Sequence, residues 1–149
     1  MIQIRHALSL GLLAATLGLG ACSSTTMASN TVAITAKLTG SAEVPANASA
    51  GSGTLEATLD KQTNLLSWTV SYSGLSGPVK AGHFHGPAMA GQNAGVALGF
   101  SGSMDSPIKG SATLTAAQLA DLMAGKWYVN LHTAANPGGE IRGQATVAP

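Results

Sequence analysis

Three histidines are the side chains of this chain that are best suited to hold a metal ion. His83 and His85 form a His-x-His motif within the segment GHFHGP. Residues two apart on a strand point to the same face, so both imidazoles can reach one ion. His132 lies in a second candidate strand, and an imidazole from there would complete a set of three nitrogen ligands. Such a set suits Zn²⁺ or copper with one coordination position left open.

Other polar residues near these histidines are candidates for supporting roles. Glu140 could supply a fourth, oxygen ligand or fix the tautomer of a histidine, because partners behind the ligands orient them. Asn130 shares the strand face of His132 and could donate a hydrogen bond to the site. Glu140 and Arg142 would share one strand face as a charge pair, for which a solvent-facing or edge-capping role is the simpler interpretation. A thioether from Met89, in the glycine-rich loop that follows, would favour Cu(I).

The competing interpretation of the histidines is structural. Histidines beside glycine at strand ends often cap loops by hydrogen bonding to backbone groups. Both His85-Gly86-Pro87 and His132-Thr133 precede predicted turns. The metal interpretation requires that the strands of His85 and His132 be neighbours, which the sequence leaves open.

Composition and motifs argue against other kinds of chemistry. Only 9% of the residues are charged, and six basic and six acidic residues remain once Arg5 leaves with an export signal. A net charge near zero gives no electrostatic footprint for nucleic acid. No nucleophile motif surrounds the serines, the carboxylates show no pair for glycoside hydrolysis, and the glycines lie in turns rather than in a phosphate loop. We therefore expect no enzyme activity and no nucleic acid partner, and the identity of any protein or small-ligand partner is open.

The N-terminal segment predicts export and a lipid anchor. Residues 1–21 combine a short basic start with an apolar run from Ala7 to Gly20, which is the layout of a secretory signal peptide. Small residues precede Cys22, the only cysteine, and this ending resembles the bacterial lipobox, in which the cysteine is acylated and cleavage falls just before it. The alternatives are weaker. A transmembrane helix needs about 20 apolar residues, and this apolar run is shorter. A plain secreted protein would carry a cysteine at this position only by chance.

The anchor predicts where the protein resides and how the rest of the chain is divided. Several acyl chains on Cys22 would hold it stably in a membrane, since each buried CH₂ contributes about 0.8 kcal/mol. Ser23 stands where an aspartate would retain a lipoprotein in the inner membrane, so we expect an outer-membrane address in the cell envelope, facing the periplasm or the surface. Residues 22–31 form the predicted tether, and residues 32–149 form a single domain.

Hydrophobic periodicity predicts an all-β domain. Apolar residues alternate with polar ones in several short runs, which are separated by Gly, Pro, Asn and Asp: 32–38, 55–59, 68–72, 96–100, 127–131 and 141–147. This pattern predicts an antiparallel β-sandwich or barrel. One short helix is expected at about residues 116–124, with Thr115 as N-cap, Gln118 as its capping-box partner and Gly125 after its end. Asn136-Pro137-Gly138-Gly139 suits a type II turn that joins the last two strands as a hairpin.

Three longer segments give a more specific resemblance. AKLTGSAEVP (36–45), WTVSYSGLSGPVKAGHFHGPA (68–88) and WYVNLHTAANPGGEIRGQ (127–144) resemble the CHRD domain, named from chordin and found in bacterial exported proteins. The resemblance implies an immunoglobulin-like β-sandwich or barrel over about residues 32–147, and it implies little about activity. Ala46 replaces the second proline that usually follows the Val-Pro of the family motif. The motif positions of this chain are Glu43, Val44, Pro45, His83, His85, Gly86, Pro87, Asn130, His132, Pro137, Gly138, Gly139, Glu140, Arg142 and Gly143.

A fainter resemblance links GHFHGPAMAGQNAG to the copper-binding strand of Cu/Zn superoxide dismutase. The zinc loop, the disulfide and the histidines of a two-metal centre are missing, so dismutase activity is not expected. Two hypotheses follow. The first is a membrane-anchored, non-enzymatic binding module in the envelope. The second is a periplasmic protein that binds copper or zinc through His83, His85 and His132.

Overall fold

The computed structural model describes residues 30–149. The predicted signal peptide, Cys22 and most of the predicted tether lie outside the described residues. The described chain forms eight strands, one short α-helix and one 3₁₀ turn. In chain order these are β1 (Thr31–Thr39), η1 (Gly40–Ala42), β2 (Ser52–Asp60), β3 (Leu65–Ser73), β4 (Val79–His85), β5 (Val96–Gly99), β6 (Ile108–Thr113), α1 (Ala116–Met123), β7 (Trp127–Thr133) and β8 (Ile141–Val147).

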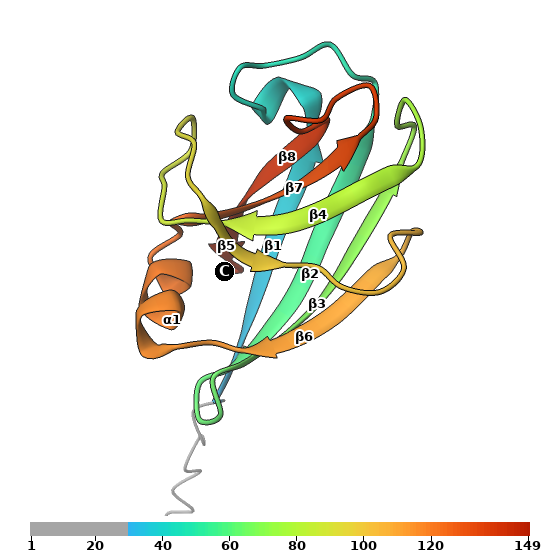
Figure 1. Cartoon of the computed structure of the whole chain (residues 1–149). Helices are drawn as coiled ribbons and strands as arrows, with labels where there is room; N and C mark the ends of the chain where they lie inside the picture. The colour runs from blue at the N-terminus through green and yellow to red at the C-terminus, as the bar shows by residue number, and fades with distance from the viewer. Residues whose placement is uncertain (1–29) are drawn as a thin grey trace, which may run out of the picture.

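All eight strands belong to one sheet that curls on itself (Figure 1). The strand order is β5-β4-β7-β8-β1-β2-β3-β6, and every pairing is antiparallel. The edge strands β5 and β6 both lie at the front in Figure 1, so the sheet is a half-barrel that stays open between them. The predicted all-β antiparallel fold is therefore confirmed.

The core lies inside the curl of this sheet. In β1, β2 and β3 alternate residues are buried and their neighbours are largely exposed, because successive side chains point to opposite faces. Trp68, Phe84 and Phe100 form a cluster in which the ring centroids are 5.3–5.5 Å apart. Trp127 packs against Phe84 at 5.7 Å. These aromatic contacts join the β3 side of the half-barrel to the β4–β7 side, which carries the histidines.

β4 and β6 have no counterpart among the predicted apolar runs, although the His-x-His motif had placed a strand at β4. β6 reads IKGSAT, and only Ile108 in it is buried. Since β6 is an edge strand that pairs with β3 alone, it needs little apolar alternation to be held in place. The strand β3, which does alternate, provides the hydrogen-bonding edge on which β6 pairs, so the β6 sequence itself carries no strand signal.

The predicted helix is confirmed with its cap. α1 begins after Thr115, whose side chain accepts a hydrogen bond from the backbone of Gln118, and the Gln118 side chain accepts one from the backbone of Thr115. Gly125 follows its end with φ +68°, a conformation that favours glycine. Leu122 is fully buried, so this face of the helix packs onto the core. Within residues 30–149, no helix is both long and apolar enough to cross a membrane.

The β7–β8 hairpin is confirmed, but the predicted turn type is wrong. The amide of Gly139 donates to the carbonyl of Asn136 at 3.1 Å, which closes a four-residue turn. A type II turn would require positive φ at Gly138. The structure instead places positive φ at the next residue, Gly139, at +129°. The turn therefore occupies the predicted residues 136–139, but its positive φ lies at the last residue of the turn and not at Gly138.

Three connections meet at one end of the half-barrel, at the top of Figure 1: the segment from η1 to β2, the β3–β4 connection and the β7–β8 turn. Asn47, in the first of these, donates to the carbonyls of Gly139 and Glu140 at 3.3 and 3.1 Å. The β7–β8 turn is thus fixed by a segment more than 90 residues away in the sequence. The same turn contacts His132 through the carbonyl of Pro137.

Candidate metal centre

The outward side chains of β4, β7 and β8 form a polar face of the sheet. The strand register places His83 opposite Asn130 and His85 opposite Tyr128, while Asn130 lies opposite Arg142. Directly paired residues point to the same side of a sheet. We call this surface the histidine face, and it comprises His83, His85, Tyr128, Asn130, His132 and Arg142.

Loops cover much of the histidine face, although it points away from the core. Tyr128 and Asn130 are each 3% exposed and Arg142 is 2% exposed. The loop between β4 and β5 lies over Tyr128, whose hydroxyl is 3.3 Å from the carbonyl oxygen of Ala94. The β7–β8 turn lies beside His132. Polar groups are thus held in a partly buried layer, where an unpaired lone pair is costly.

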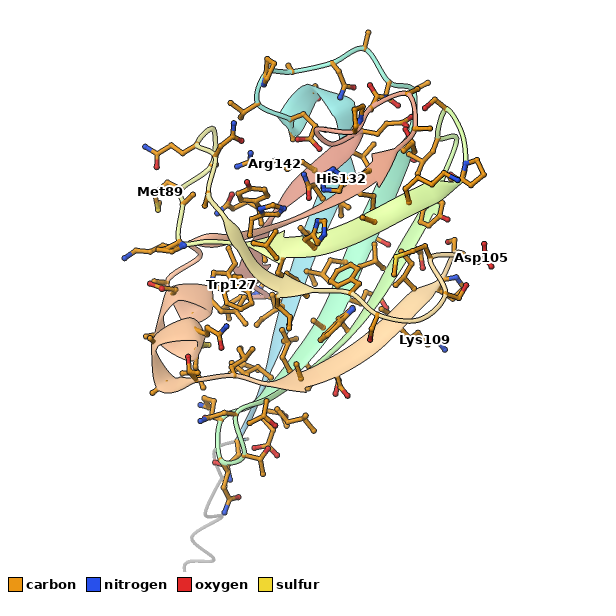
Figure 2. All side chains as sticks on the ribbon, viewed as in Figure 1. Met89, Asp105, Lys109, Trp127, His132 and Arg142 are labelled. Carbon is orange, nitrogen blue, oxygen red and sulfur yellow. The ribbon has the colours of Figure 1, made fainter. Side chains whose placement is uncertain are left out.

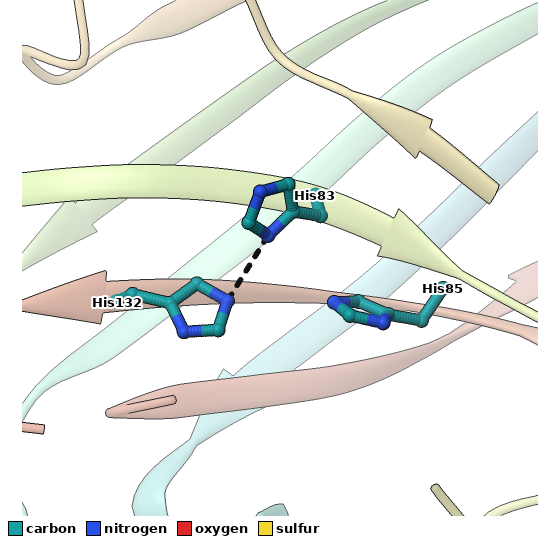
Figure 3. Close-up of side chains that lie close together, drawn as sticks. All are labelled: His83, His85 and His132. Atoms are coloured by element: carbon teal, nitrogen blue, oxygen red, sulfur yellow. Dashed lines mark hydrogen bonds between the residues drawn. The ribbon is translucent and has the colours of Figure 1, made fainter. Parts of the chain in front are cut away.

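The three histidines come together on this face (Figure 3). One ring nitrogen from each of them lies within 4.8 Å of the others. Nδ1 of His83 and Nε2 of His132 are 3.1 Å apart, and the ring centroids of His83 and His85 are 5.4 Å apart. The strands of His85 and His132 are neighbours, as the metal interpretation requires.

Two of the rings are fixed by backbone carbonyls on their outer side. Nδ1 of His85 lies 3.0 Å from the carbonyl oxygen of Ala94, and Nδ1 of His132 lies 2.9 Å from that of Pro137. A carbonyl can only accept, so in each neutral ring Nδ1 carries the hydrogen and Nε2 keeps its lone pair. These are the loop-capping contacts of the structural interpretation, and they also set the tautomer that a metal ligand needs.

The ring nitrogens that face the other histidines have few hydrogen-bond partners. Nε2 of His85 is buried and has no hydrogen-bond partner among the described residues, and Figure 3 shows a ring nitrogen of His85 facing His132. Burial lowers the pKa of His83, and the neighbouring His132 and His85 lower it further. Burial also lowers the pKa of His132, against the opposing effect of the Pro137 carbonyl. Neutral imidazoles are the form that binds metal ions.

Arg142 acts on the site through an aromatic ring. Its guanidinium carbon lies 3.3 Å from the centroid of the Tyr128 ring, and that ring stacks on His85 with an interplanar angle of 2°. The guanidinium also donates to the Asn93 side chain at 2.9 Å and to the Gln92 carbonyl at 2.5 Å. Arg142 therefore holds both the covering loop and the Tyr128 ring against which His85 packs.

Glu140 is not brought to the histidines, contrary to the sequence-based expectation. Its carboxylate accepts hydrogen bonds from the backbone and side chain of Ser76 and from the hydroxyls of Ser49 and Thr133, at 2.5–2.8 Å. It precedes the first residue of β8, where strand alternation does not apply. The expected pairing with Arg142 is also wrong, because both groups bind other partners. Burial raises the pKa of Glu140, but the hydrogen bonds outweigh it and lower the pKa to about 2.

Glu43 is a member of this region for which the sequence suggested only a motif position. It is 7% exposed, and its Oε1 is buried without a hydrogen-bond partner among the described residues. Burial raises its pKa to about 7, although the charge of Arg142 works in the opposite direction. A Cβ atom at Gly139 would lie 2.5 Å from Glu43 Oε1 and 2.8 Å from Asn130 Nδ2. Glu43 thus lies beside Asn130, which itself contacts His132.

Met89 is placed away from the site. Its side chain is 55% exposed, and Figure 2 shows it at the periphery of the loop, apart from His132 and Arg142. The predicted thioether contribution therefore has no geometric support. Tyr128, by contrast, belongs to the site, and its strand parity with Asn130 and His132 is the sequence signal that could identify it.

The arrangement offers three imidazole nitrogens to one ion. Two ligand atoms that are each about 2.0–2.1 Å from Zn²⁺ lie roughly 3.3 Å apart in a tetrahedral site. The 3.1 Å between His83 Nδ1 and His132 Nε2 is close to this value, and the His85 nitrogen lies within 4.8 Å of the other two. Three imidazoles with a further position available suit Zn²⁺ or copper.

One of three comparisons with known proteins gives a match. The family model of the CHRD domain matches residues 34–145 of the chain. This span runs from β1 into β8 and contains every residue of the histidine face. No curated protein matches the chain, and no solved structure matches it.

Proposed function

The chain belongs to the CHRD domain family, and from this premise we propose that it is a non-enzymatic binding module, which a lipid anchor at Cys22 holds in the cell envelope. The domain accounts for most of the chain, so the module is a single one. The support for the anchor is the signal-like segment that ends at Cys22. The support for a non-enzymatic role is the lack of a nucleophile motif or a carboxylate pair in the sequence.

The anchor predicts incorporation of fatty acid at one residue. Cells that express the full chain and are fed a labelled fatty acid should yield a labelled protein, and a Cys22→Ser variant should carry no label. The mature wild-type protein should begin at Cys22 in mass spectrometry. Equal labelling of both proteins, or a mature N-terminus elsewhere, would contradict the anchor.

A second candidate function is favoured by one observation, the convergence of three histidine nitrogens within 4.8 Å. In this candidate the module binds a transition metal ion, zinc or copper, through His83, His85 and His132. The burial that lowers the pKa of His83 and His132, the carbonyl contacts that orient the His85 and His132 rings, and the unpartnered Nε2 of His85 support it. A purely structural cluster would account for the outer contacts of the rings but would leave that nitrogen unsatisfied.

The metal function predicts one ion per chain. The full-length protein in detergent, titrated with Zn²⁺, Cu²⁺ and Cu(I) in competition with a coloured chelator, should take up one equivalent of at least one of these ions. Calcium should not compete, since it takes oxygen ligands. A folded wild-type protein that removes none of the three ions from the chelator would leave the histidines a structural cluster.

A further inference from the structure

Nε2 of His132 faces an atom with which it cannot form an ordinary hydrogen bond. Asn130 Oδ1 lies 3.0 Å from it, and an amide oxygen only accepts. Since Nδ1 of His132 faces the Pro137 carbonyl, the hydrogen of the neutral ring is on that side. Two lone pairs therefore meet at hydrogen-bond distance with no hydrogen between them.

His83 does not resolve this conflict by itself. Its Nδ1 could donate one hydrogen to Nε2 of His132 over 3.1 Å. Asn130 Oδ1 gains no hydrogen from that contact, and Nε2 of His85 keeps its unpaired lone pair. The site has more acceptors than hydrogens, and a single cation between them would satisfy all of them.

The nitrogen end of the Asn130 amide faces the region of Glu43 and Gly139. Nδ2 of Asn130 and Oε1 of Glu43 both border the space that a Cβ atom at Gly139 would fill. The amide nitrogen thus lies on the side of Glu43, and Oδ1 lies on the side of His132. The backbone of Gly139, with φ +129° and no side chain, makes room for this arrangement.

We propose that Asn130 Oδ1 is the fourth ligand of the metal centre, so that the ion is held by three histidine nitrogens and one amide oxygen. This rests on the metal function proposed above and names the class of ion. An amide oxygen is a hard donor, which suits Zn²⁺ and Cu²⁺, whereas Cu(I) prefers sulfur. The site is thus built for a divalent ion.

The test is to replace Asn130 and measure two oxidation states of copper beside zinc. Asn130→Leu in the full-length protein keeps the volume and removes the oxygen. We expect its affinity for Zn²⁺ to fall at least about tenfold, its affinity for Cu(I) to stay at the wild-type value, and its Cu²⁺ electron paramagnetic resonance spectrum to change. Asn130→Asp, which retains an oxygen at the same place, should bind Zn²⁺ at least as tightly as the wild type.

The outcomes separate this inference from the function on which it rests. If the wild type binds zinc and Asn130→Leu binds it equally well with an unchanged copper spectrum, the fourth ligand is refuted and the three histidines remain. If the wild type binds none of the ions, both proposals fall. If Asn130→Leu shows no thermal unfolding transition and is therefore unfolded, the Asn130→Asp variant provides the test. Weaker zinc binding by a folded Asn130→Asp variant would refute the oxygen ligand.

Discussion

Replacing His83 or His132 with alanine is expected to lower the affinity for Zn²⁺ by about 100-fold or more, while the fold is retained. Loss of a residue that merely supports a metal ligand already costs about 10–100-fold, and these two side chains are proposed as ligands themselves. Both rings are partly exposed at the edge of the covering loops, so their removal leaves no large cavity in the core. Isothermal titration with Zn²⁺ and a thermal melt of each variant provide the measurement.

A matched control lies on the same strand. Lys80 is an exposed residue of β4, and Lys80→Ala should bind zinc as the wild type does. In the wild type, zinc should also raise the melting temperature, since an ion that binds only the folded state stabilises it. Two histidine variants that unfold, with no zinc effect on the wild type, would support the structural interpretation instead.

Replacing Glu140 with alanine is expected to destabilise the fold by at least about 3 kcal/mol, because hydrogen bonds to a charged acceptor contribute about 1.5–3 kcal/mol each. Its carboxylate accepts from Ser49, Ser76 and Thr133, and it joins three connections at the top of the half-barrel. The variant would leave the amide of Ser76 without this acceptor. Urea unfolding of the two proteins at pH 7 measures the difference.

The same carboxylate predicts acid sensitivity with a defined direction. The pKa of Glu140 lies at about 2 in the folded state against 4.5 for an ordinary glutamate. Its contribution is therefore complete above pH 4.5 and is lost as the pH falls toward 2. The wild type should lose this stability over that range and Glu140→Ala should lack it. Glu56→Ala, at an exposed position of β2, is the control. If Glu56→Ala lost as much stability as Glu140→Ala, the account would be contradicted.

The parts of the fold that were predictable are those in which burial imposes a period of two. β1, β2 and β3 have one face in the core and one in solvent, so their sequences alternate. β6 was missed because an edge strand with a single buried residue needs no such pattern. The turn type was wrong because glycines at both 138 and 139 permit positive φ, and only the tertiary contacts of the turn select Gly139.

The candidate site was predictable to the extent that strand parity governs it. Parity correctly put Asn130 on the face of His132 and His83 beside His85. Strand parity does not apply to Glu140, because it lies in the turn before β8. Its carboxylate accepts hydrogen bonds from Ser76 and Ser49, which lie 64 and 91 positions away in the sequence. Glu43 reaches the site through η1 and the following loop, and no local pattern predicts such a long-range contact.

The measurement that tests the metal centre most directly is X-ray absorption at the zinc edge of the full-length, zinc-loaded protein. The account predicts a first shell of three nitrogens and one oxygen at about 2.0–2.1 Å from zinc. The three imidazole rings should add their multiple-scattering signal. The His132→Ala variant should lose one of those imidazoles. A first shell of oxygen atoms alone, or a spectrum that His132→Ala leaves unchanged, would contradict the histidine face as the site of metal binding.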